Sequence, residues 1–252
     1  MRDSALRLND KTILLVGPFN GTTQAILRTM TEFGSDVAFV CSGTSYAGKY
    51  VDGVNEAREA NPHYGRAAHF DLPVNAPEEI KEALSRVAET FGRMDVLMDA
   101  YPLTWDEKTD TTSALRSCRE RAQALVPFFQ AKQRGRVIHF MGDTCLTKLG
   151  LPLLPESVRL ALEEHVRTLA LEYRQWAVTV NALALGVTED FILRHFPQSG
   201  SIRKSLTELQ KVHPEIKLVE STEVALGAAY LASALSASLT GQTLRLTHGF
   251  HL

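Results

Sequence analysis

The sequence predicts an α/β fold with a doubly wound parallel sheet, in a single domain that spans residues 1–252. Short apolar runs of strand length alternate with longer segments of helical spacing, and no repeat, low-complexity tract or Pro/Gly-rich linker divides the chain. Strands that alternate with helices of ten or more residues indicate βαβ units, whose strands are parallel. A length of 252 residues suits one such domain.

The expected elements follow one another closely along the chain. The first strand, residues 11–17, is a continuous apolar run that ends in glycine, as is typical of a buried parallel strand. The next segment, residues 22–33, carries apolar residues at helical spacing and stops before Gly34, a natural helix cap. Further strands are expected at 36–41, 67–70, 94–98, 136–140, 178–183 and 242–247, and further helices at 55–60, 77–91, 111–133, 156–173 and 219–235.

Composition excludes several classes of function. A net charge of -2 gives no electrostatic attraction to nucleic acid or to an anionic membrane, and no apolar run approaches the length of a membrane span. Cys41, Cys118 and Cys145 are widely spaced and form no ligand cluster, so we expect reduced thiols and no bound metal. We therefore expect a cytoplasmic protein with neither a nucleic-acid nor a membrane partner.

Three segments resemble the short-chain dehydrogenase/reductase family, abbreviated SDR. Residues 135–140, GRVIHF, are similar to the family's fifth strand, GRIVNI; residues 180–186, VNALALG, are similar to VNAVAPG; and residues 239–250 are similar to the ending TGxTLxVNGG. The resemblance covers nearly the whole chain, and the nearest subgroup looks like the 3-oxoacyl-carrier-protein reductases and related acyl-CoA alcohol dehydrogenases. It implies a Rossmann-like fold and, in active members, NAD- or NADP-linked chemistry.

The catalytic positions that this resemblance implies hold residues without the required chemistry. The family's serine falls on Gly142, its tyrosine on Pro155, its lysine on Arg159 and its helical asparagine on Ala114. Proline and glycine have nothing to titrate, and arginine stays protonated at any working pH. We expect no catalytic residue at these four positions, so the chain is not expected to be an enzyme by itself.

The cofactor-binding turn also departs from the family pattern TGxxxGxG. Gly17 and Gly21 are present, but the third glycine is Thr23, and Pro18 removes one N–H from the loop. Such a turn indicates either a weakened nucleotide site or a tight turn that only feeds the helix. Asp71 matches an adenine-contacting aspartate of the family, but it is equally typical of a capping residue.

The segment after the fourth strand is bulkier than in the family. Where the family has NNAG, this chain has residues 99–102, DAYP, so Tyr101 and Pro102 would fill volume that the cofactor riboses occupy. We expect a cleft that is closed or nearly so, in which Gly17, Gly21 and Asp71 are vestigial. No cofactor is expected on this chain; NAD is expected in an active partner subunit.

The surface that remains is one for assembly. In the family, helices corresponding to 111–133 and 156–173 pair across a two-fold axis, and the apolar residues of 156–173 form more than one stripe. The chain resembles the inactive subunit type of heteromeric SDRs, such as (hydroxybenzyl)succinyl-CoA dehydrogenase of anaerobic toluene degradation. We interpret it as a non-catalytic subunit that pairs, through these helices, with an active SDR paralogue or with itself, to complete an NAD-dependent hydroxyacyl-CoA dehydrogenase.

Two alternatives remain open. One is a small-molecule-sensing or scaffolding homo-oligomer that uses a remodelled cleft. The other is an oxidoreductase with relocated acid–base residues, for which Asp143, Lys148 and His165 are the nearest candidates. The segment 191–218 is of full length for a substrate loop, and its pattern fits a lid, a partner-facing flap or a solvated helical hairpin.

Overall fold

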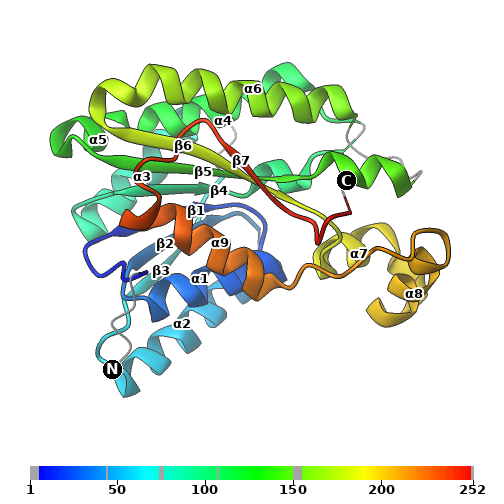
Figure 1. The fold of residues 1–252 in the computed structure, drawn as a ribbon. Coiled ribbons are helices and arrows are strands. Elements are labelled where there is room, and N and C mark those ends of the chain that lie inside the picture. The colour runs from blue at the N-terminus through cyan, green and yellow to red at the C-terminus, as the bar shows by residue number, and fades with distance from the viewer. Residues whose placement is uncertain (1–5, 44, 74–76, 107, 150–154, 251–252) are drawn as a thin grey trace.

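A seven-stranded parallel sheet forms the centre of the computed structural model, which describes residues 6–43, 45–73, 77–106, 108–149 and 155–250. The strand order is β3-β2-β1-β4-β5-β6-β7, and every neighbouring pair is parallel (Figure 1). The strands are β1 Thr12–Val16, β2 Asp36–Cys41, β3 Ala67–Asp71, β4 Val96–Asp99, β5 Gly135–Gly142, β6 Val178–Leu185 and β7 Thr243–Leu246. The predicted α/β doubly wound fold is confirmed.

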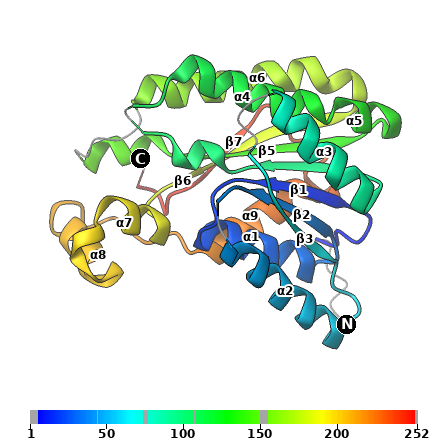
Figure 2. The same ribbon diagram turned by 180° about the vertical axis from the view of Figure 1, so that it is seen from behind.

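Helices cover both faces of this sheet. On one face lie α1 Gly21–Glu32, α2 Ser45–Ala60 and α9 Ser221–Ala232; on the other lie α3 Pro77–Phe91, α4 Thr111–Ala124, α5 Val126–Lys132 and α6 Glu156–Tyr173 (Figures 1 and 2). Each layer buries its own apolar cluster against the sheet. None of the helices in the described ranges is long and apolar enough to cross a membrane.

The helix expected at 111–133 is in fact two helices. Helix α4 ends at Ala124, and α5 begins at Val126 with Pro127 in its first turn. Proline lacks the N–H that would continue the hydrogen-bond ladder of α4, so the chain restarts its helix there. The surface attributed to one long helix is therefore divided between two.

Helix α6 buries only one of the apolar stripes that its sequence carries. Leu162 and Val166 are fully buried in the core of this chain, whereas Leu160 and Leu171 are 51% and 64% exposed. Arg119 of α4 ion pairs with Glu172 of α6 at 2.6 Å and links the two helices. An outward face with two leucines remains on α6.

The segment after β6 carries two further helices, α7 Glu189–His195 and α8 Ile202–Val212. They pack on each other around a small apolar cluster that includes Ile192 and Ile216. Both helices lie beyond the carboxyl ends of the central strands, to one side of the two helical layers (Figures 1 and 2). This position brings α7 against the edge where ligands of open α/β sheets bind.

Candidate functional site

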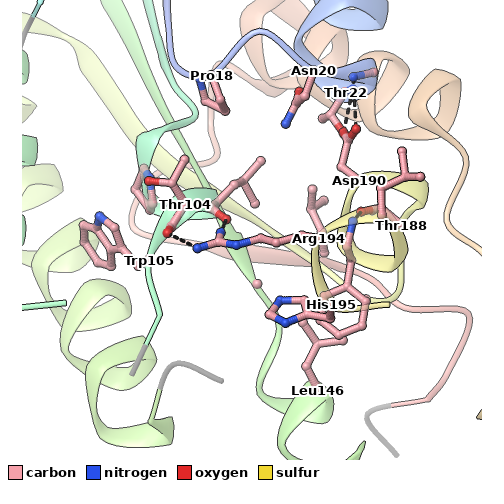
Figure 3. A pocket seen from close by; sticks show the side chains of 18 of the residues that line it. Pro18, Asn20, Thr22, Thr104, Trp105, Leu146, Thr188, Asp190, Arg194 and His195 are labelled. Carbon is pink, nitrogen blue, oxygen red and sulfur yellow. Dashed lines mark hydrogen bonds between the residues drawn. The ribbon is translucent and has the colours of Figure 1, made fainter. Parts of the chain in front are cut away.

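A cavity of about 610 Å³ opens at the carboxyl ends of β1, β4, β5 and β6 (Figure 3). It lies beside the point where the strand order reverses between β1 and β4, which is the usual ligand position of a doubly wound sheet. Its lining residues are Pro18, Phe19, Asn20, Gly21, Thr22, Pro102, Leu103, Thr104, Trp105, Gly142, Leu146, Arg159, Leu185, Gly186, Thr188, Asp190, Phe191, Leu193, Arg194 and His195. The sequence predicts a cleft that is closed or nearly so, and the cavity shows that this prediction is wrong for this part of the cleft.

Hydrogen bonds between its own residues stabilise the turn after β1. Asn20 caps α1: its side-chain oxygen accepts from the Thr23 N–H at 3.0 Å, and the Asn20 N–H donates to the Thr23 hydroxyl at 3.1 Å. The Thr23 hydroxyl also donates to the Pro18 carbonyl at 2.6 Å. Gly17 lets this turn approach β4, because a Cβ there would lie 2.7 Å from the Cβ of Ala100. The Thr23 hydroxyl therefore stabilises the turn through its hydrogen bonds to Asn20 and Pro18.

The carboxylate of Asp190 lies directly at the N-terminus of α1. It accepts from the Gly21 N–H at 3.0 Å, from the Thr22 N–H at 2.8 Å and from the Thr22 hydroxyl at 2.5 Å (Figure 3). The N–H groups of a helix N-terminus are the donors that hold a phosphate in dinucleotide-binding folds. Here a side chain from α7 already occupies two of them.

The other two donors at the start of α1 are also satisfied within the chain. The Thr23 N–H donates to the Asn20 side chain at 3.0 Å, and the Asn20 N–H donates to the Thr23 hydroxyl at 3.1 Å. The four N–H groups that a helix normally leaves unpaired at this end therefore all have intramolecular acceptors. An anion would have to displace Asp190 to reach them.

The C-terminal end of α7 is hydrogen-bonded to the opposite side of the cavity. Arg194 donates to the Leu103 carbonyl at 2.9 Å and to the Thr104 carbonyl at 2.5 Å (Figure 3). These carbonyls belong to η1, the 3-10 helix Tyr101–Thr104 that follows β4. Helix α7 is thus hydrogen-bonded to α1 on one side of the cavity and to η1 on the other. The residue after Arg194, His195, lines the cavity, and burial lowers the pKa of its imidazole.

The four positions that the family uses for catalysis are only partly brought together. Gly142 and Arg159 both line the cavity, and a Cβ on Gly142 would lie 3.7 Å from Arg159 Nη1. Pro155 is an exposed N-cap of α6, and Ala114 is half-buried in the first turn of α4. No group that could take up or release a proton near neutral pH stands at any of the four.

The adenosine side of the family's cofactor site is filled differently. The Tyr101 ring lies 5.0 Å from the Arg121 guanidinium, and burial raises the pKa of its phenol. The exposed carboxylate of Asp71 accepts from the Gly43 N–H at 2.9 Å. Burial and the nearby Asp71 raise the pKa of the Cys41 thiol to about 11. Two of the three residues predicted to be vestigial thus make hydrogen bonds within the chain: the Asp71 carboxylate accepts from a loop N–H, and the Gly21 N–H donates to Asp190.

A buried polar cluster lies between the sheet and the α4–α6 layer. Asp99 accepts from Arg121 Nε and Nη2 at 3.0 and 2.9 Å, and His139 Nδ1 lies 3.3 Å from it. Burial alone would raise the pKa of Asp99, but Arg121 and His139 lower it to about 2. Ligand atoms of Asp99, Cys118 and His139 lie within 4.8 Å of one another, as a metal site would require. The Arg121 guanidinium, 3.4 Å from the Cys118 sulfur, already supplies the cation.

Two of the candidate replacement bases lie away from the cavity lining. Asp143 is buried and ion pairs with Arg245 of β7. His165 packs against His139 with 6.1 Å between ring centroids, and burial lowers its pKa to about 4. The side chain of Lys148 lies outside what the structure describes. The polar residues of α7 that line the cavity are Asp190, Arg194 and His195. None of the three was predicted as a site residue: Asp190 lies just before the segment 191–218, and Arg194 and His195 lie inside it.

The family model described as enoyl-(acyl carrier protein) reductase matches residues 18–251. The chain belongs to the short-chain dehydrogenase/reductase family. It is 24% identical over 258 residues to D-beta-hydroxybutyrate dehydrogenase of Rhizobium meliloti, covering 95% of this chain and 98% of that protein. It is 24% identical over 265 residues to 3-oxoacyl-acyl-carrier-protein reductase of Vibrio cholerae, covering 98% of this chain and 100% of that protein.

The fold has close structural neighbours in the same family. The crystal structure of hydroxysteroid dehydrogenase from Escherichia coli matches with a TM-score of 0.77 and 19% identity, over 97% of this chain and 98% of that one. The names of these relatives are those of oxidoreductases. The chain therefore has an oxidoreductase fold, in which Gly142, Pro155, Arg159 and Ala114 stand at the family's four catalytic positions.

Proposed function

We propose that this chain is a catalytically inactive SDR subunit that completes a hetero-oligomeric, NAD-dependent hydroxyacyl-CoA dehydrogenase with an active SDR paralogue. The observation that carries the proposal is the hydrogen bonding of Asp190 to Gly21 and Thr22, at 2.5 to 3.0 Å. A dinucleotide pyrophosphate needs these N–H groups and would meet a negative charge in their place. NAD is then bound by the partner subunit and not by this chain.

The residues at the family's catalytic positions support the same proposal. An SDR reaction needs a base that takes the hydroxyl proton of the substrate, and a base acts only within hydrogen-bond reach. At the tyrosine position this chain has the exposed Pro155, and at the serine position Gly142. The positively charged Arg159 accepts no proton.

The surface of α6 supports the assembly. Leu160 and Leu171 are 51% and 64% exposed and lie about three turns apart on the outward face. Arg119 and Glu172 hold α4 beside that face. Exposed aliphatic side chains gain roughly 25 cal/mol per Å² when a partner covers them, before the costs of association. We propose that the paralogue, or a second copy of this chain, packs here.

Co-expression with a candidate partner, an SDR paralogue of the same genome in which the catalytic serine, tyrosine and lysine are intact, tests the proposal. We expect a stable complex by light scattering after size-exclusion chromatography, and NAD reduction with 3-hydroxybutyryl-CoA by the complex only. Leu160→Glu and Leu171→Glu should divide the complex and lower that activity, because each places a charge in an apolar contact. Val212→Glu, at a residue 74% exposed on α8, is the matched control. A paralogue that is stable and fully active alone would contradict the proposal.

The open cavity favours one second candidate, the ligand-sensing homo-oligomer. A volume of about 610 Å³ with mainly apolar walls is within the range that small-molecule sites occupy. Homo-oligomers of the isolated chain, with a ligand and without any paralogue, would favour this candidate over the heteromeric subunit.

A further inference from the structure

Two polar side chains face the cavity with hydrogen-bonding groups that the described part of the chain leaves unused. His195 points into the cavity from the C-terminal end of α7, and Asn20 from the N-terminus of α1 (Figure 3). Both ring nitrogens of His195 lack a hydrogen-bond partner among the described residues, and the ring packs against Phe191 with 4.6 Å between ring centroids. Asn20 accepts through its side-chain oxygen, whereas its Nδ2 donates to none of the described residues. A ligand in the cavity would therefore meet free donors and a free acceptor.

The charged groups of the lining are already engaged within the chain. Asp190 accepts three hydrogen bonds from the first turn of α1, and Arg194 donates to two carbonyls of η1. Arg159 is 1% exposed, donates to the Asp143 carbonyl and interacts with the charge of Glu156. A charged ligand would lose its hydration here without gaining a free counter-charge, which disfavours anions and cations alike.

The imidazole of His195 is predominantly uncharged near pH 7. Burial and the neighbouring Arg194 lower its pKa from the ordinary value of 6.5, against the opposite effect of Asp106. A neutral imidazole donates through one ring nitrogen and accepts through the other, and the amide nitrogen of Asn20 is an uncharged donor as well. Both unused side chains therefore suit a neutral oxygen-containing group.

Apolar side chains make up most of the remaining wall. They come from the turn after β1, from η1 and the loop behind it, from the carboxyl ends of the central strands and from α7: Pro18, Phe19, Pro102, Leu103, Trp105, Leu146, Leu185, Phe191 and Leu193. A volume of about 610 Å³ admits a molecule of small-ligand size. An apolar body would be removed from water against these walls, which stabilises the complex.

We propose that the cavity binds an uncharged, mainly apolar molecule with a hydroxyl or carbonyl group, whose oxygen is hydrogen-bonded to the imidazole of His195. A carbonyl accepts from the ring N–H, and a hydroxyl can use either ring nitrogen. The proposal goes beyond the inactive-subunit function and does not depend on it, because the whole lining belongs to one chain. Binding to the isolated chain therefore tests it whatever the oligomeric state.

Three probes of equal chain length test the charge requirement. Octanol, octanoate and octylamine are titrated into the full chain at pH 7 by calorimetry. In a Trp176→Phe background they are also followed by the fluorescence of Trp105, which is then the sole tryptophan and lines the cavity. We expect octanol to bind about tenfold or more tightly than either charged probe, because neither charge finds a free partner. No octanol binding at millimolar concentration, or binding of a charged probe as tight as that of octanol, would overturn the proposal.

Histidine variants test the residue. His195→Phe keeps an aromatic ring against Phe191 and removes both hydrogen-bonding nitrogens, so we expect octanol binding to weaken about fivefold or more. His195→Gln restores an uncharged donor and acceptor and should bind octanol more tightly than His195→Phe. His63→Phe makes the same change at an exposed histidine outside the cavity lining and should leave binding unchanged.

Unaltered octanol binding by a folded His195→Phe variant would refute the assignment of this residue. Circular dichroism and thermal unfolding show whether the variant is folded. Should it fail to fold, the comparison of the three probes on the wild-type chain decides alone.

Discussion

Replacing Asp190 by alanine removes a carboxylate that holds α7 against α1 and accepts hydrogen bonds from the N-terminal N–H groups of α1. The lost interactions are two hydrogen bonds from backbone N–H groups and one from the hydroxyl of Thr22, which is 1% exposed. A lost acceptor at a helix N-terminus costs about 0.5–2 kcal/mol, and a buried hydroxyl left without a partner costs about 1–3 kcal/mol. Because water reaches the exposed Gly21 N–H, we expect a total loss of about 2–3 kcal/mol in the free energy of unfolding.

Thermal unfolding measures this loss. For a chain of this size each kcal/mol corresponds to about 2–4 °C, so Asp190→Ala should melt roughly 4–12 °C below the wild-type chain. Asp190→Asn keeps one acceptor oxygen and should fall between the two. Glu189→Ala removes a carboxylate from the same turn of α7 and should have little effect.

The same variants test whether the Asp190 carboxylate keeps anions from the N-terminus of α1. With the carboxylate gone, the donors of α1 become available to an anion, so pyrophosphate should stabilise Asp190→Ala and leave the wild-type chain unchanged. At ten times its dissociation constant the added stability is about 1.4 kcal/mol. Sodium chloride at matched ionic strength is the control. The reasoning is refuted if Asp190→Ala melts with the wild-type chain, or if pyrophosphate stabilises both proteins equally.

The buried charges of the α4–α6 layer give two further predictions. Asp99→Asn should lower the free energy of unfolding in urea by about 3–5 kcal/mol, because it leaves the Arg121 guanidinium buried without its counter-charge, and a loss below about 1 kcal/mol would contradict this role. Burial lowers the pKa of His165 in the folded chain from 6.5 to about 4. Between these two pH values the unfolded chain therefore binds more protons than the folded chain. The free energy of unfolding should then fall as the pH drops from about 6.5 to about 4. His165→Gln should flatten that part of the pH dependence, and an unchanged slope would show that other groups cause it.

The fold was predictable because its signals are local. The apolar run 11–17, the glycine after the first helix and the family motifs at 135–140 and 180–186 each act within a few residues. The break between α4 and α5 also had a local signal, Pro127, which the helical spacing of the longer segment masked. A proline inside a periodic segment indicates a helix boundary even where the apolar pattern continues.

The site was only partly predictable, since its main contact joins distant segments. Asp190 and Gly21 are 169 positions apart, and nothing in either segment states that α7 will lie on the first turn of α1. The four catalytic positions were located from motifs, but the exposure of Pro155 and the burial of Arg159 in a cavity floor depend on packing. Sequence identified the groups that are missing, whereas the groups that replace them required the structure.

These replacements follow a single physical requirement. The start of α1 has four N–H groups that need acceptors, those of Asn20, Gly21, Thr22 and Thr23. The side chains of Asn20 and Thr23 provide one acceptor each, and Asp190 provides the other two. Each of these bonds stabilises the chain without ligand, and the bonds to Asp190 would have to be broken before a phosphate could bind. The contact that stabilises the start of α1 in the chain without ligand is therefore the same contact that a phosphate would have to break, and the free energy of unfolding lost in Asp190→Ala measures its contribution to stability.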